Sequence, residues 1–159
     1  MTGAPDLAWL TDDIARRCRV LADSFAHLLG RPLLADISAD DRTLARRLYE
    51  APVVIVSHGN ESDPLFWFAN RTAQRLWEMD WSHFTRTPSR LSAEADERAM
   101  RETLLRRAEE NGYIDDYRGV RISASGRRFR IEEVILWNLA DERGQRIGQA
   151  ATFAHWTFQ

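Results

Sequence analysis

Three strand-like runs joined by glycine-bearing turns occupy residues 112–156, and they constrain the fold of this chain most. The runs read GYIDDYRGVRIS, RFRIEEVILWNLADERG and GQAATFAHW. Runs of β-branched and aromatic residues separated by short turns predict an antiparallel meander. A sheet of this kind has two faces to cover, so we expect the upstream residues to supply further strands and the covering helices.

The upstream residues contain the signals of two strands and four helices. Residues 53–57 and 65–69 are apolar and rich in β-branched or aromatic side chains, which predicts two strands. Apolar spacing and end signals predict helices over residues 7–29, 38–51, 70–79 and 93–111. Asn70 stands where a strand meets a helix and is predicted to be an N-cap. This order predicts an α+β fold, a five-stranded antiparallel sheet with helices on one face and the N-terminal helix on the other.

Apolar spacing indicates which side of two helices points inward. In the first helix one stripe consists of Ile14, Cys18, Leu21, Phe25 and Leu28. We expect this stripe to cover the sheet face that carries Trp137, and we expect the same helix to form a homodimer. The inward residues predicted for the last helix are Met100, Leu104 and Ala108.

Composition bounds the class of protein. The 159 residues are 44% hydrophobic, which suits one globular unit, divided here into an N-terminal helical extension (residues 1–37) and a domain (residues 38–159). A formal net charge of −2 gives no basic field for nucleic acid or an anionic membrane. We expect a cytoplasmic protein, because the sequence has no signal peptide and no apolar run of about 20 residues. Cys18 is the only cysteine, so neither an internal disulfide nor a cysteine-based zinc site is expected.

Motifs of known chemistry are missing from the sequence. It contains no phosphate loop, dinucleotide fingerprint or nucleophile elbow. The four histidines are scattered without metal-ligand spacing, and His58 stands in a predicted loop, HGNESD. We therefore predict no metal and no catalytic residue.

Seven blocks of sequence, in order, carry a resemblance to a known family. They are PLFWFAN, LWEMDW, PSRLSAE, GYIDDYRGVRIS, GRRFRIE, ILWNLADERG and GQAATFAHW. Together they resemble the MEKHLA family, a PAS-like domain that occurs alone in bacteria and at the C-terminus of plant homeodomain–leucine zipper proteins. The resemblance covers roughly residues 44–156 and indicates the bacterial stand-alone type. The 159 residues hold neither homeodomain nor zipper, so the DNA-binding role of the plant proteins is not carried over.

The resemblance implies a ligand cavity between the sheet and the crossing helices. Strand alternation predicts that one face of the long strand carries Arg130, Glu132, Val134, Leu136 and Asn138 towards this cavity, and that the other carries Phe129, Ile131, Ile135, Trp137 and Leu139. The inward residues of the neighbouring strands are then Tyr117, Gly119, Arg121 and Ser123, and Gln149, Ala151, Phe153 and His155. The candidate ligand-binding residues are Trp67, Arg90, Tyr117, Arg121, Arg130, Glu132, Asn138, Gln149 and Phe153.

Arg121 and Glu132 decide between two interpretations of this face. They form either a structural ion pair that fixes strand register, or a site in which Arg121 binds the carboxylate or phosphate of a small ligand. The leading hypothesis is a non-catalytic sensory domain that binds a small polar or anionic molecule. A protein-interaction or dimerisation module without ligand and an enzyme using the Arg121 and Glu132 face stay open as alternatives. The cofactor is open; haem and cysteinyl-flavin chemistry are not expected, because the last helix lacks histidine and Cys18 lies in the first helix.

Overall fold

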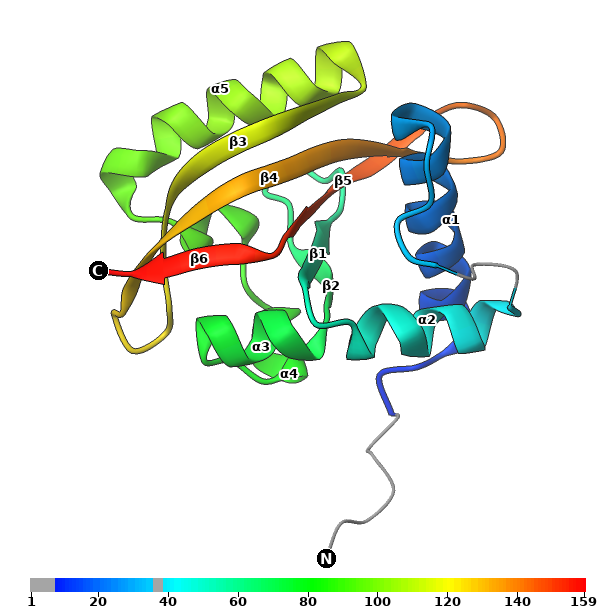
Figure 1. The fold of residues 1–159 in the computed structure, drawn as a ribbon, viewed down its shortest axis with the longest axis horizontal. Coiled ribbons are helices and arrows are strands. Elements are labelled where there is room, and N and C mark those ends of the chain that lie inside the picture. Colours follow the sequence, from blue (N-terminus) through cyan, green and yellow to red (C-terminus); the bar gives the residue numbers. More distant parts are fainter. Residues whose placement is uncertain (1–7, 36–38) are drawn as a thin grey trace, which may run out of the picture.

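A computed structural model describes residues 8–35 and 39–159, which form one antiparallel sheet with helices on both faces (Figure 1). The strand order is β2-β1-β5-β4-β3, and β6 pairs with the free half of β4. The strands are β1 (Val54–His58), β2 (Phe66–Ala69), β3 (Tyr113–Ile122), β4 (Arg128–Ala140), β5 (Arg146–Phe153) and β6 (His155–Phe158). The predicted meander is therefore confirmed as β3, β4 and β5, and the two upstream strands complete the five-stranded order.

Four of the five helices of the described residues match predicted ones, although the first begins at Asp12 instead of residue 7, and the short helix Trp81–Phe84 was not predicted. The helices are α1 (Asp12–Leu29), α2 (Asp41–Glu50), α3 (Arg71–Trp77), α4 (Trp81–Phe84) and α5 (Ala95–Asn111), with a 3₁₀ turn η1 (Ser89–Ser92) before α5. Thr11 caps α1 by accepting a hydrogen bond from the Ile14 amide, and Gly30 ends the helix in the left-handed region at φ 72°. Asp40 caps α2 by accepting from the Thr43 amide, whereas the predicted start, Ser38, lies outside the described residues.

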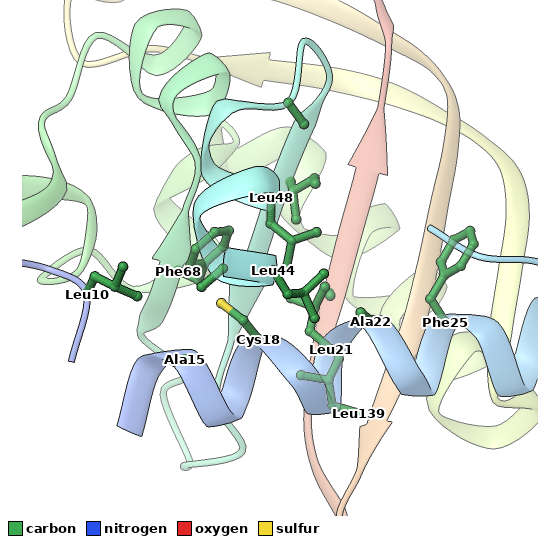
Figure 2. Packing of buried hydrophobic residues seen from close by; sticks show 14 of the residues in the cluster. Leu10, Ala15, Cys18, Leu21, Ala22, Phe25, Leu44, Leu48, Phe68 and Leu139 are labelled. Carbon is green, nitrogen blue, oxygen red and sulfur yellow. The ribbon is translucent and has the colours of Figure 1, made fainter. Parts of the chain in front are cut away.

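Helix α1 covers one face of the sheet, as predicted. Its apolar stripe packs against α2 and the second half of β4, and Figure 2 shows Cys18 and Leu21 on the side of α1 that faces Leu44 of α2. The Trp137 ring meets Phe25 edge-on at 5.0 Å, and its indole N–H donates to the Leu21 carbonyl oxygen at 3.1 Å. The expected homodimer through α1 stays a prediction. Within the chain this stripe already packs against α2 and β4.

Asn70 ties α2, β1 and α3 together at a fully buried point. Its side-chain oxygen accepts from the Ala73 amide, which confirms the N-cap, and also from the Ile55 amide. Its side-chain nitrogen donates to the carbonyl oxygens of Leu48 and Val53. One amide side chain thus satisfies four buried backbone groups between three elements.

A β-bulge divides β4 into two halves whose side chains alternate out of phase. Tyr117 and Gly119 of β3 pair with Val134 and Ile131, so two steps along β3 correspond to three along β4. Glu133 lies in the left-handed region at φ 54° within this extra step. A bulge of this kind exchanges the two faces for every residue on its far side.

The faces predicted for β4 are consequently right after the bulge and wrong before it. Ile135, Trp137 and Leu139 face α1 as predicted. Phe129 and Ile131 instead belong to the apolar cluster on the opposite face, the one that α5 covers. Arg130 and Glu132 therefore point away from that face.

Helix α5 lies along β3 on the face opposite α1 (Figure 1). Its inward side differs by one residue from the prediction: Arg101 is 7% exposed, whereas Met100 is 61% exposed. Ala108 is buried as predicted, and Leu104 and Leu105 both pack against the cluster on this face. Helix α5 thus brings a cationic side chain under its inner surface.

Candidate functional site: a cavity under helix α5 with two buried arginines

A cavity of about 50 Å³ lies between the sheet and α5. Apolar side chains from β1, β2, β4 and β5 make most of its wall. Six residues with polar side chains also line it: His58, Ser92, Arg101, Tyr117, Arg121 and Gln149. No carboxylate lies among the lining residues in the described part of the chain.

Two arginines reach this cavity from opposite walls. Arg121 on β3 is 6% exposed; it donates to the Val120 carbonyl oxygen and to the Tyr117 hydroxyl, and its guanidinium lies 5.4 Å from the Tyr117 ring. Arg101 on α5 makes no hydrogen bond or ion pair with any described residue. Burial, together with the nearby charge of Arg121, lowers the pKa of Arg101 to about 10. Both guanidinium groups therefore keep unused N–H donors next to the cavity.

Gly119 makes room for the arrangement of Arg121 and Tyr117. A Cβ atom at this position would lie 2.7 Å from the Tyr117 hydroxyl oxygen and 3.1 Å from a terminal nitrogen of Arg121. Any larger residue would push the two polar ends out of place.

His58, at the end of β1, presents a hydrogen-bond acceptor to the same cavity. Its Nδ1 lies 2.9 Å from the Gly59 carbonyl oxygen, and a carbonyl only accepts, so Nδ1 carries the proton. Burial lowers the pKa of His58 to about 4, and the charges of Arg101 and Arg146 act in the same direction. The ring is therefore neutral at neutral pH, and its Nε2 is a buried lone pair with no partner among the described residues.

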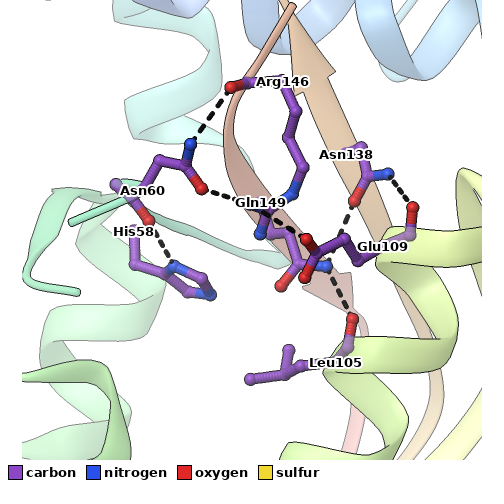
Figure 3. Close-up of polar contacts among 8 residues, drawn as sticks. His58, Asn60, Leu105, Glu109, Asn138, Arg146 and Gln149 are labelled. Carbon is purple, nitrogen blue, oxygen red and sulfur yellow. Dashed lines mark hydrogen bonds and ion pairs between the residues drawn. The ribbon is translucent and has the colours of Figure 1, made fainter. Parts of the chain in front are cut away.

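A chain of amides fixes the orientation of Gln149 (Figure 3). Asn138 donates to the Glu109 carbonyl oxygen, so its side-chain oxygen faces Gln149. The Gln149 nitrogen donates to that oxygen at 3.1 Å and to the Leu105 carbonyl oxygen at 2.8 Å. Both amide protons are used, which leaves the Gln149 side-chain oxygen as a second acceptor at the cavity.

Comparison with known proteins decides the family. The sequence profile of the MEKHLA domain matches residues 15–158 of the 159. The chain belongs to the MEKHLA domain family. No curated protein matches this MEKHLA domain.

Solved structures agree with the PAS-like fold. The PAS domain of a protein from Colwellia psychrerythraea superposes with a TM-score of 0.62 at 14% identity, over 70% of this chain and 92% of that one. An RNA-binding light-oxygen-voltage receptor superposes with a TM-score of 0.63 at 17% identity. The match covers 76% of this chain and only 34% of the receptor. A light-oxygen-voltage domain studied with a flavin analogue gives 0.59 at 14% identity, over 74% and 84% of the two chains. At these identities the likeness concerns the fold.

Four of the nine predicted site residues line the cavity of the MEKHLA domain. They are Tyr117, Arg121, Gln149 and Phe153. Asn138 does not line the cavity, but its side-chain oxygen accepts a hydrogen bond from Gln149. Whether any of them binds a ligand stays a prediction.

The other four lie elsewhere, and the arrangement of the chain explains each. Arg90 is exposed and pairs with Asp63 at 3.1 Å. Trp67 belongs to the cluster under α1, because a register shift in the pairing of β1 with β2 turns Phe66, not Trp67, towards the cavity. Arg130 and Glu132 point outwards because of the β4 bulge.

The predicted proximity of Arg121 and Glu132 is therefore wrong. Arg121 pairs in register with Phe129, whereas Glu132 lies opposite His155 of β6. His155, predicted to point inward, is exposed and lies 3.3 Å from Glu133. The negative charge expected beside Arg121 is on the other side of the sheet.

Sequence reasoning missed Arg101 and took His58 for a loop residue. The set Arg101, Leu105 and Ala108 has helical spacing as good as the predicted set. Met100 was predicted to point inward only because it is apolar. The signal that could have revealed Arg101 was its helical spacing with Leu105 and Ala108, which places an arginine on the buried side of the helix. For His58, the β-branched run directly before it indicated a strand long enough to include it.

Neither a metal site nor a membrane span emerges from the described residues. No group of three or more His, Cys, Asp or Glu side chains is placed to hold a metal ion. No helix in this part of the chain is long and apolar enough to cross a membrane.

Proposed function

We propose that this MEKHLA domain is a sensory module that binds a small anion in the cavity under α5, between Arg101 and Arg121. The observation that carries the proposal is the pair of buried arginines at a cavity with no carboxylate among its described lining residues. Burying one uncompensated charge costs several kcal/mol, and two like charges close together cost more. A bound carboxylate or phosphate would offset that cost through charge-assisted hydrogen bonds.

The position of the two arginines supports a sensory role. Arg121 belongs to the central sheet and Arg101 to α5. An anion held by both would connect the helix to the sheet, so its arrival would favour one position of α5 over others. A ligand shifts such an equilibrium by its difference in affinity for the two states.

The size of the cavity favours a compact ligand. About 50 Å³ suits a small oxyanion or a short organic acid, not the three fused rings of a flavin. The cysteine does not fit flavin–cysteinyl chemistry either. Cys18 is buried in α1 on the far side of the sheet, and burial raises the pKa of its thiol.

The proposal is tested by thermal shift and titration calorimetry with a panel of anions, namely phosphate, sulfate, acetate and glycolate. Stabilisation by an anion follows mass action and reaches about 2.7 kcal/mol at a hundred times the dissociation constant. Arg121→Met and Arg101→Met should each abolish the shift. Arg130→Met is the matched control, because Arg130 is an exposed arginine on the neighbouring strand, and it should bind like the wild type.

Two results would contradict the proposal. Equal binding by wild type and Arg121→Met would remove Arg121 as an anchor. A wild-type protein that binds no member of the panel would favour the alternative, an interaction or dimerisation module whose arginines only pack.

A further inference from the structure

The cavity offers hydrogen-bond acceptors as well as cations. His58 Nε2 is buried and has no hydrogen-bond partner among the described residues, and it carries a lone pair because Nδ1–H is donated to the Gly59 carbonyl oxygen. His58 is 7% exposed and Gln149 is 2% exposed. His58 and Gln149 are partners on the neighbouring strands β1 and β5, and Figure 3 shows both side chains near Leu105.

An ordinary anion leaves these acceptors unsatisfied. A carboxylate or sulfate only accepts hydrogen bonds, so it pairs with the arginines and with nothing on His58 or Gln149. Two lone pairs facing an acceptor-only anion repel it, and a buried acceptor without a donor carries a desolvation penalty. The walls of the cavity are therefore matched to a ligand of mixed character.

We infer that the ligand of this site is an anion that carries its own O–H or N–H donor. Its anionic oxygens would lie on Arg101 and Arg121, and its donor would point to His58 Nε2, with the Gln149 oxygen as second acceptor. Protonated oxyanions such as hydrogen phosphate and short hydroxycarboxylates such as glycolate share this chemistry. The inference rests on the proposed function and adds the class of anion that the site selects.

The fixed orientations of both acceptors give the selection its strength. Gln149 is held by Leu105 and Asn138, and Asn138 is held in turn by the Glu109 carbonyl oxygen. Neither amide can flip without losing these bonds. If the proton of His58 moved from Nδ1 to Nε2, the lone pair of Nδ1 would face the Gly59 carbonyl oxygen, which is also an acceptor. A site that cannot turn an acceptor into a donor rejects an analogue that lacks the matching hydrogen.

The test compares two pairs of anions that differ by one donor: hydrogen phosphate with sulfate, and glycolate with acetate. Affinities are measured by titration calorimetry on the wild-type protein at pH 7.5. We expect each donor-bearing anion to bind roughly tenfold tighter or more than its counterpart, the worth of one buried hydrogen bond. In His58→Phe, which keeps a ring without the acceptor, both ratios should fall close to one. His58→Gln, whose amide oxygen supplies an acceptor, should recover part of the preference, and His83→Phe, on the exposed surface of α4, should keep it.

Each outcome bears on a separate claim. Equal affinities within both pairs in the wild type would overturn this inference and leave the anion site standing; such a result would follow if Arg101 itself donated to His58 Nε2. A preference that survives in His58→Phe would remove His58 as the acceptor. Failure of all four anions to bind would overturn the proposed function itself.

Discussion

Protonation of His58 should make this domain lose stability in mildly acidic solution. The folded state holds the ring neutral, because burial and the charges of Arg101 and Arg146 oppose a further positive charge. An unfolded chain exposes the ring, whose pKa then returns to about 6.5. Between these values the unfolded state binds more protons than the folded state, so the free energy of unfolding falls as pH falls.

The magnitude follows from the two pKa values. A lowering from 6.5 to about 4 corresponds to roughly 3 kcal/mol at full effect. The contribution is intact above pH 6.5 and lost as pH falls towards 4. Between pH 7.5 and pH 5 the loss from His58 alone should be about 2 kcal/mol, a large share of the stability of an ordinary domain.

The assay is urea unfolding followed by tryptophan fluorescence at several pH values from 5 to 7.5, in buffers without phosphate or carboxylate. His58→Phe should have a shallower dependence of unfolding free energy on pH, by about 2 kcal/mol across that range. His83→Gln serves as control, because His83 is exposed on α4. If wild type and His58→Phe show parallel curves, His58 does not titrate as a buried neutral ring, and its role as an acceptor fails with it.

Four further predictions concern the site and the fold. Gly119→Ala should weaken phosphate binding by roughly tenfold in calorimetry with little change in melting temperature, because its Cβ displaces only the flexible ends of Tyr117 and Arg121; unchanged affinity would contradict this. Asn70→Ala should cost about 3–5 kcal/mol in urea unfolding, since it leaves buried backbone groups unpaired, whereas the exposed Asn60→Ala should cost far less. Deleting residues 1–30 should expose the sheet face around Trp137 and cause aggregation, and a soluble fragment that melts like the intact chain would refute that packing. The predicted homodimer through α1 should give twice the monomer mass in light scattering, and a monomer mass at high micromolar concentration would exclude it.

Local signals predicted the elements well because most of them act over short distances. Thr11, Gly30 and Asn70 cap helices through bonds to residues three or four positions away, so spacing in the sequence is enough to recognise them. The α1 stripe was equally readable, because a helix repeats every 3.6 residues and its apolar face must be buried.

The candidate site was predicted only in part, because small geometric shifts decide which side chains meet. A single extra residue at Glu133 sends Glu132 away from Arg121, and a one-residue rotation of α5 exchanges Met100 for Arg101. Both alternatives satisfy the same local patterns. Strand alternation has a period of two, so each bulge reverses the prediction for everything beyond it.

The sequence by itself determined five of the strands, four of the helices, the family and the stripe that α1 buries, because each depends on neighbours in the chain; it did not separate β6 from β5 or show α4. Only the tertiary structure decided the chemistry of the cavity. It set Arg101 opposite Arg121, gave His58 a carbonyl oxygen that fixes its tautomer, and locked Gln149 between α5 and β4. The reason is physical: the charge state and the donor or acceptor role of a buried group depend on which distant groups surround it.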